Sequence, residues 1–201
     1  MDGDWRERNI GTMSPRDLPS PVGLKEEIAD LFARESAGML RYACPLAGDP
    51  DMARDAVQEA FFRFFIVRSS GQSIVSPKAW LFRVVRNYLF DYRRAASRIA
   101  AGMESLRDVP DPSPSPGGED IVDLVQGLPQ IGLSPREVEC VRLRMEDLRY
   151  DEIAGVLGLQ PGTVGALLNR AHDKIRKAVA ARMQQEHRAT RALTEEKRYA
   201  S

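Results

Sequence analysis

Cysteine and histidine are scarce in this sequence, with two of each among 201 residues. Cys44 and Cys140 lie far apart and lack the spacing of metal ligands, so we interpret them as small buried apolar residues rather than as a disulfide. His172 and His187 have no cysteine, aspartate or serine arranged with them as in a nucleophilic or metal site. This scarcity argues against an enzyme, and we expect no catalytic residue, no metal and no cofactor.

The sequence also lacks a net charge and a long hydrophobic run. Lysine and arginine together number 29, and aspartate and glutamate together number 29. Any affinity for nucleic acid must therefore come from charges segregated on the surface. No segment has the length and apolarity of a membrane helix, and the N-terminal residues lack the apolar core of a signal peptide. We expect a cytoplasmic protein in a reducing setting, without direct membrane insertion.

Strand-like alternation and internal repeats are absent as well, whereas apolar residues recur with helical spacing. The expected fold is all-α, with two small helical domains joined by a flexible linker, the second a helix-turn-helix. The expected boundaries are a flexible N-terminal arm at 1–23, a helical domain at 24–101, an acidic Pro/Ser/Gly linker at 102–127, the helix-turn-helix domain at 128–182 and a charged tail at 183–201. The tail is interpreted as either frayed helix or disorder.

The residues from Ser134 to Lys177 have the pattern of three short helices with tight turns. Ser134, Pro135 and Glu137 fit a helix start with a capping box. Gly158 suits the left-handed residue that ends the second helix, and Pro161 opens the third. The second and third helices have the spacing of a helix-turn-helix, which usually places a helix in the DNA major groove. The alternative is a small three-helix bundle with no nucleic-acid role.

The third of these helices has an outward face that is poor in base-reading groups. The predicted face consists of Thr163, Ala166, Asn169, Arg170, Asp173 and Lys177. Gly165, Ala166 and Leu167 occupy positions where a DNA reader often carries Arg, Lys, Asn or Gln. Thr163, Asn169 and Arg170 are the groups left to touch DNA, so weak or unusual base contacts are expected.

An acidic patch is predicted on the helix that starts near Asp49. Its inward stripe consists of Val57, Ala60, Phe61 and Phe64, which leaves Asp55, Gln58, Glu59 and Phe62 on the opposite side. Carboxylates around an exposed aromatic ring suit the docking of a basic partner, with Phe62 as the anchor. The alternative is that Phe62 packs against another helix of the same domain.

A basic helix is predicted over 77–98, with six basic residues and one acidic residue. Trp80 is interpreted as a core residue. One face of this helix gathers Arg83, Arg86, Asn87, Phe90 and Arg94, a mixture that suits phosphate contacts and stacking on exposed bases. The polar loop at 69–76 just before it can hydrogen-bond an extruded base. The alternative is a solvated charged face above core aromatics.

Three segments of the chain resemble parts of bacterial sigma factors. The region 2 helix of that family, which meets the polymerase clamp, is similar to DPDMARDAVQEAFFRFF, and its promoter-melting helix is similar to PKAWLFRVVRNYLFDYRR. Region 4 is similar to LSPREVECVRLRMEDLRYDEIAGVLGLQPGTVGALLNRAHDKIR. Because no domain lies between them, the resemblance is to the two-domain, extracytoplasmic-function type, from about Leu24 to Val179.

The resemblance implies a protein that joins core RNA polymerase and directs promoter recognition, −10 melting and transcription initiation. The implied clamp-binding residues are Asp55, Gln58, Glu59 and Phe62. The implied −10 residues are Arg83, Arg86, Asn87, Tyr88, Asp91, Arg93 and Arg94 of the basic helix, with Ser69, Ser70, Gly71, Gln72 and Ser73 of the loop. The implied −35 residues are Thr163, Ala166, Asn169 and Arg170.

The resemblance also implies further partners: the polymerase flap for region 4, the polymerase RNA path for the acidic linker, and an anti-sigma factor. The recognition helix departs from the family pattern Gly-Thr-Val-Lys-Ser-Arg-Leu-x-Arg-Ala, because Gly165 and Leu167 replace its Lys and first Arg. This departure favours one alternative function, a sigma-like interaction protein that titrates an anti-sigma factor without reading DNA. For the acidic linker, the alternative role is solubility alone.

Overall fold

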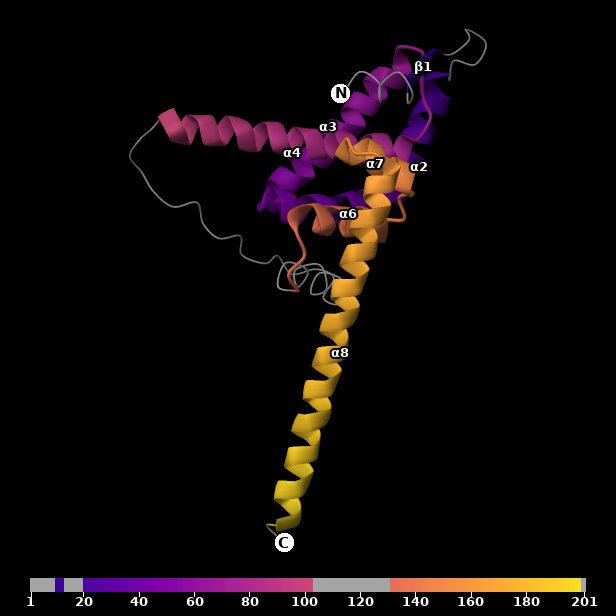
Figure 1. Ribbon diagram of the computed structural model, residues 1–201. Helices are drawn as coiled ribbons and strands as arrows, with labels where there is room; N and C mark the ends of the chain where they lie inside the picture. The colour runs from indigo at the N-terminus through magenta and orange to yellow at the C-terminus, as the bar shows by residue number, and fades with distance from the viewer. Residues whose placement is uncertain (1–9, 13–19, 103–130, 200–201) are drawn as a thin grey trace.

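The computed structural model describes residues 10–12, 20–102 and 131–199. The helices are α2 (Pro21–Ala47), α3 (Pro50–Ser69), α4 (Pro77–Gly102), α6 (Pro135–Met145), α7 (Tyr150–Leu157) and α8 (Pro161–Tyr199), and the strands are β1 (Ile10–Thr12) and β2 (Gln72–Ile74). The all-α class is confirmed (Figure 1). The acidic linker and its expected place in the polymerase RNA path lie outside the described residues. Within the described residues, no helix is long and apolar enough to cross a membrane.

The first domain is a bundle of α2, α3 and α4. The Asp49 side chain caps α3 by accepting hydrogen bonds from the amides of Asp51 and Met52. Trp80 is buried, and its ring lies 5.9 Å from that of Phe64 in an edge-on contact, which confirms its place in the core. The stripe of Val57, Ala60, Phe61 and Phe64 is also buried, as the helical spacing predicted.

A two-stranded antiparallel sheet forms at one end of this bundle, where the sequence predicted only a flexible arm and a polar loop. β1 pairs with β2, and Ile10 lies opposite Ile74. Gly71 makes the turn into β2 with a φ of 78°, which favours glycine. Strands of three residues are too short to produce an alternating pattern that the sequence alone would reveal.

The second domain consists of α6, α7 and α8. The predicted capping box is present, since Ser134 and Glu137 each bond the other's backbone amide, and Gly158 ends α7 in the left-handed conformation with a φ of 65°. α8 continues well beyond the predicted end of the domain at residue 182 and runs through the charged tail to Tyr199. It projects from the body as a single helix (Figure 1).

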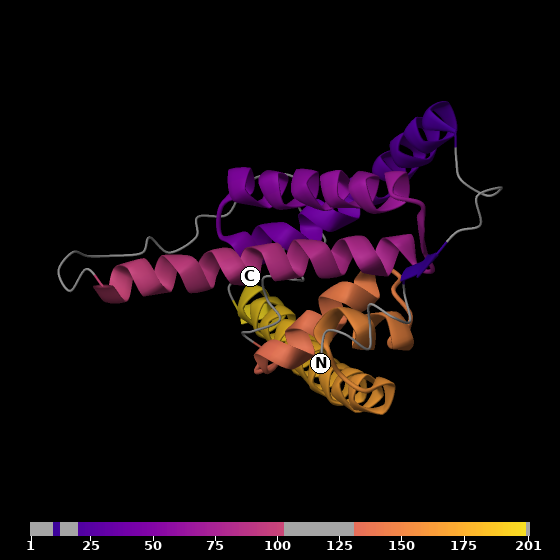
Figure 2. The same cartoon turned by 90° about the horizontal axis from the view of Figure 1, so that it is seen from above.

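The two domains share one hydrophobic core, although the sequence predicted two units separated by a flexible linker. Leu143, Ile153 and Leu157 of the second domain belong to the same buried cluster as Val85 and Leu89 of α4. Seen from above, α6 and α7 lie against the bundle beside α4 (Figure 2), and α7 packs directly on α4.

Both cysteines are free, as predicted, although Cys44, which was also predicted to be buried, is only half-buried. Cys140 is buried in the shared core, and burial raises the pKa of its thiol to about 11. Burial also raises the pKa of the Cys44 thiol. Both thiols therefore remain protonated at neutral pH and behave as small apolar groups.

Candidate nucleic-acid and protein interfaces

The acidic patch of α3 is exposed and concave. Phe62 is 59% exposed, so the alternative in which it packs within its own domain is wrong. The patch forms one side of a shallow hollow of about 320 Å³, called here the acidic hollow, which is lined by Asp55, Gln58, Glu59, Phe62 and Tyr88. An exposed ring among carboxylates has the composition of a docking surface for a basic and apolar partner.

The sequence reasoning missed two residues that extend this surface. Phe65 and Ile66 are each about half exposed and lie three and four positions after Phe62 on α3. Tyr88, which was predicted for the −10 helix surface, lines the acidic hollow. Helical spacing could have predicted that Phe65 and Ile66 lie on the same face as Phe62, because residues at i+3 and i+4 share a helix face with residue i.

The second domain covers one part of the basic face of α4 and leaves the other part exposed. Arg83 is only 7% exposed and donates a hydrogen bond of 2.5 Å to the Gly155 carbonyl of α7. The Arg86 Nε donates to Glu139 Oε1 of α6 at 2.6 Å, and the guanidinium lies 4.4 Å from the Phe90 ring centre. The predicted nucleic-acid face is therefore only partly exposed in this structure, because the second domain covers Arg83 and Arg86.

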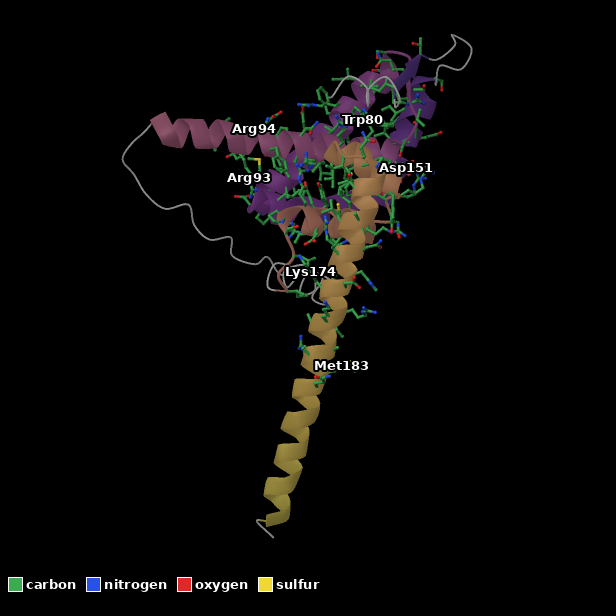
Figure 3. All side chains as sticks on the ribbon, in the orientation of Figure 1. Trp80, Arg93, Arg94, Asp151, Lys174 and Met183 are labelled. Carbon is green, nitrogen blue, oxygen red and sulfur yellow. The ribbon has the colours of Figure 1, made fainter. Side chains whose placement is uncertain are left out.

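The remaining predicted residues of α4 are open to solvent. Asn87, Asp91, Arg93 and Arg94 are exposed, and Arg94 Nη1 lies 3.9 Å from Asp91 Oδ1. Arg93 and Arg94 lie on the part of α4 that extends past the second domain (Figure 3). The exposed arginines therefore supply a positive surface that does not depend on the position of the second domain.

The predicted −10 loop is shorter than expected. Ser69 is the last residue of α3, and the Ser69 and Ser70 hydroxyls donate to the carbonyls of Ile66 and Val67 at 3.1 and 2.8 Å. Gln72 and Ser73 belong to β2. Both hydroxyls therefore bond the end of α3, and the side chain of Gln72 is exposed.

The recognition helix α8 exposes Thr163, Ala166, Asn169 and Arg170, as predicted. Leu167 is buried in the core and does not belong to the outward edge. The part of that edge without base-reading side chains therefore consists of Gly165 and Ala166. Tyr150 lies beneath Gly165, and a Cβ placed there would be 3.7 Å from the ring, which is an ordinary packing distance.

Glu137 connects the start of α6 to the recognition helix. Its Oε2 accepts hydrogen bonds from the Ser134 amide at 2.8 Å and from Lys174 Nζ at 2.7 Å, while its Oε1 lies 3.5 Å from Arg170 Nε. The Lys174 hydrogen bond and then the Ser134 amide lower the pKa of Glu137 to about 2. This carboxylate therefore orients α8 and one of its candidate DNA-contacting residues.

Replacing Glu137 with glutamine is expected to lower the free energy of unfolding at pH 7 by about 1.5–3 kcal/mol, the range for hydrogen bonds to charged groups. Because the folded-state pKa is depressed, the stabilisation is complete above the usual value of 4.5 and is lost as pH falls toward 2. Urea unfolding from pH 7 to pH 2.5 should thus show the two proteins converging. The control is Asp173→Asn, an exposed carboxylate of α8. A gap that stays constant with pH would contradict this role for Glu137.

Comparison with known proteins identifies both domains. The model of Sigma-70 region 2 matches residues 31–99, and that of Sigma-70 region 4 matches residues 132–175. The solved structure of the sigma factor RpoE from Bartonella quintana, in complex with the anti-sigma factor NepR, has a similar fold. It covers 78% of this chain and 98% of RpoE, with a TM-score of 0.58 and 24% identity. These matches define a two-domain protein of the sigma-70 class.

Two relatives give the finer assignment. The ECF RNA polymerase sigma factor SigL of Mycobacterium tuberculosis is 30% identical over 151 residues, which cover 73% of this chain and 85% of SigL. The ECF RNA polymerase sigma factor SigE of Mycolicibacterium smegmatis is 28% identical over 198 residues, which cover 89% of this chain and 72% of SigE. The chain belongs to the extracytoplasmic-function (ECF) RNA polymerase sigma factors, and its function is to direct transcription initiation.

Proposed function

We propose that this sigma factor docks on the clamp of core RNA polymerase through the acidic hollow. The observation that carries this proposal is the exposed Phe62 ring, which lies among Asp55, Gln58 and Glu59 on α3. Binding hot spots commonly contain an aromatic side chain that loses its water on binding. The charges around such a side chain favour a partner of opposite charge, which here is a basic one. The second domain is proposed to dock on the polymerase flap.

Promoter contacts are proposed for both domains. In the first domain, Arg83, Arg86, Asn87, Arg93 and Arg94 of α4 are proposed to contact the −10 element, with Gln72 near an extruded base. In the second domain, Thr163, Ala166, Asn169 and Arg170 are proposed to face the −35 element. Since α8 offers few base-reading groups, most of the promoter discrimination is assigned to α4.

The test of this function uses the purified full chain and core polymerase. Co-purification of the two, followed by mapping of transcription starts on genomic DNA, is expected to give a stable complex and a defined set of promoters with shared −10 and −35 elements. Absence of a complex between two folded partners would overturn the proposed docking.

The alternative function, titration of an anti-sigma factor without DNA reading, is favoured by the bare edge at Gly165 and Ala166. Transcription from a promoter that is already melted, measured with the same purified chain and polymerase, separates the two functions. A chain that binds core polymerase but starts no transcription on a promoter that is already melted would support titration. An anti-sigma partner is proposed for either function, because the similar sigma factor RpoE is solved in complex with the anti-sigma factor NepR.

Replacing Gly165 with lysine is expected to strengthen binding of the full chain to duplex DNA and to steepen its salt dependence by about 0.9, the value for one further phosphate contact. Gly165→Ala is the matched control, because its Cβ fits against Tyr150 and it gains about 1 kcal/mol of helix propensity without a charge. Fluorescence anisotropy at several salt concentrations measures both slopes. Equal slopes for the two variants would show that this edge does not face DNA.

A further inference from the structure

The strand β1 places residues from the N-terminal arm directly against the predicted −10 loop. β2 contains two residues of that loop, Gln72 and Ser73, and β1 pairs with it antiparallel. The register gives three facing pairs, which are Ile10–Ile74, Gly11–Ser73 and Thr12–Gln72. A segment that the sequence predicted to be a free arm is therefore the nearest structural neighbour of the loop along this edge.

Two strands of three residues are too short to be stable alone, so the pair needs support from its surroundings. Ile74 is buried, and Ile10 packs against the same core. Arg68 Nη1 of α3 donates a hydrogen bond of 3.0 Å to the Gln72 carbonyl, and Glu27 of α2 holds the same guanidinium at 3.1 and 2.9 Å. None of these groups comes from the second domain, so this support does not depend on where the second domain lies.

Gly11 leaves room for the Ser73 hydroxyl. A Cβ placed on Gly11 would lie 2.8 Å from Ser73 Oγ, which is closer than packed side chains come. Apart from the chain neighbours of Gly11, no other atom of the described residues lies within 4 Å of that Cβ. Glycine within a strand often marks such a close approach. Any side chain at position 11 would therefore have to displace the hydroxyl.

We propose that β1 is a positioning element for −10 recognition. Its pairing holds Gln72 and Ser73 in one extended conformation, and Gly11 sets the place of the Ser73 hydroxyl. A base that has left the duplex then meets groups that are already ordered, so the loop loses its conformational freedom on folding rather than on binding. This inference rests on the proposed −10 role of the loop. It makes residues 10–12 determinants of the −10 sequence that act through β2.

The first measurement is hydrogen exchange of the full chain, followed by mass spectrometry over residues 70–76. Ile10→Ser removes the apolar side chain that fixes β1 opposite Ile74. Exchange of the β2 amides is expected to become faster, because local opening exposes them to water. Val22→Ser is the matched control, since it removes a similar side chain from a 66% exposed position of α2 outside the sheet. Its exchange over 70–76 should equal that of the wild type.

The second measurement is the base preference of the full chain in complex with core polymerase. The complex is mixed with a pool of single-stranded oligonucleotides that carry a randomised segment, and the bound fraction is sequenced. If Ile10→Ser leaves the loop in its binding conformation in about one molecule in ten, affinity for the preferred sequence falls about tenfold. Affinity for core polymerase should be unchanged, because Ile10 does not line the acidic hollow.

Gly11→Ala tests the Ser73 hydroxyl separately. It is expected to change the enrichment at one base position about fivefold, the effect of losing one ordinary hydrogen bond. In a Ser73→Ala background it should have no further effect, because the atom that the new Cβ would displace is gone. A general structural effect of the added methyl group would persist in both backgrounds. Gly11→Ala carries the test if circular dichroism shows that Ile10→Ser does not fold.

Three results would each overturn the proposal. One is exchange over 70–76 that is as slow in Ile10→Ser as in the wild type. Another is faster exchange with an unchanged affinity and base preference, and the third is an equal effect of Gly11→Ala with and without the Ser73 hydroxyl. Failure of the proposed −10 role is recognised separately: Gln72→Ala and Ser73→Ala would then bind the pool as the wild type does, and the inference would fail with that role.

Discussion

Replacing Phe62 with alanine is expected to weaken binding to core RNA polymerase about 30-fold or more while leaving the fold intact, since truncating a central aromatic anchor commonly costs 2 kcal/mol or more. The fold should tolerate the change because the side chain is 59% exposed and contributes little to the core. Affinity is measured by titrating labelled core polymerase with the purified chain.

The matched control is Tyr92→Ala. Tyr92 is also an exposed aromatic residue, at 51%, but it lies on α4 and does not line the acidic hollow. Affinity should be unchanged in this variant. If Phe62→Ala and Tyr92→Ala bind polymerase equally well, the hollow is not the docking site.

Replacing Leu143 with alanine is expected to lower the free energy of unfolding by about 2–5 kcal/mol, the range for removing a fully buried leucine side chain. Leu143 is inaccessible to solvent and belongs to the core that both domains share. The cavity should therefore destabilise the first domain as well as the second. Thermal unfolding followed by circular dichroism and by tryptophan fluorescence measures the two effects.

Trp80 lies in the core of the first domain, so its fluorescence reports unfolding there once the other tryptophan, Trp5, is replaced by phenylalanine. We expect the fluorescence and helical transitions to shift together. Met183→Ala, at an exposed position of α8 (Figure 3), should change stability by less than about 0.5 kcal/mol. A shift in the helical signal with no shift in fluorescence would mean that the domains unfold independently.

Local chemistry made much of this fold predictable. The Ser134 capping box, the left-handed Gly158 and the buried stripe of α3 each depend on residues within a few positions of one another, and each is present as predicted. The exposure of the acidic patch followed from the same helical periodicity. Its candidate role came from the family resemblance and stays a proposal.

Long-range contacts could not be predicted in this way. The contact that covers Arg86 comes from Glu139, which lies 53 residues away, and no helical period connects the two. The burial of Arg83 similarly depends on a carbonyl of α7. From one sequence, a basic face that binds nucleic acid and one that binds the protein's own carboxylates look the same.

The length of α8 could have been predicted from the sequence. After Gly165 the chain contains neither glycine nor proline, so nothing in the sequence stops the helix before its charged end. The tail was instead interpreted from its charge alone, as frayed helix or disorder. The continuous helix through Tyr199 shows that missing stop signals predicted this element better than composition.

The shared core has a consequence for domain exchange. Sigma factors with two domains invite the construction of chimeras that combine the −10 preference of one parent with the −35 preference of another. In this chain, a grafted second domain would have to bring side chains that match Arg41, Ser76 and Arg86 of the first domain. A graft without Glu139 would leave the largely buried Arg86 guanidinium without its carboxylate, and one without Glu146 or Glu152 would remove the partner of Arg41 or Ser76. The domains are therefore interchangeable only together with their contact residues.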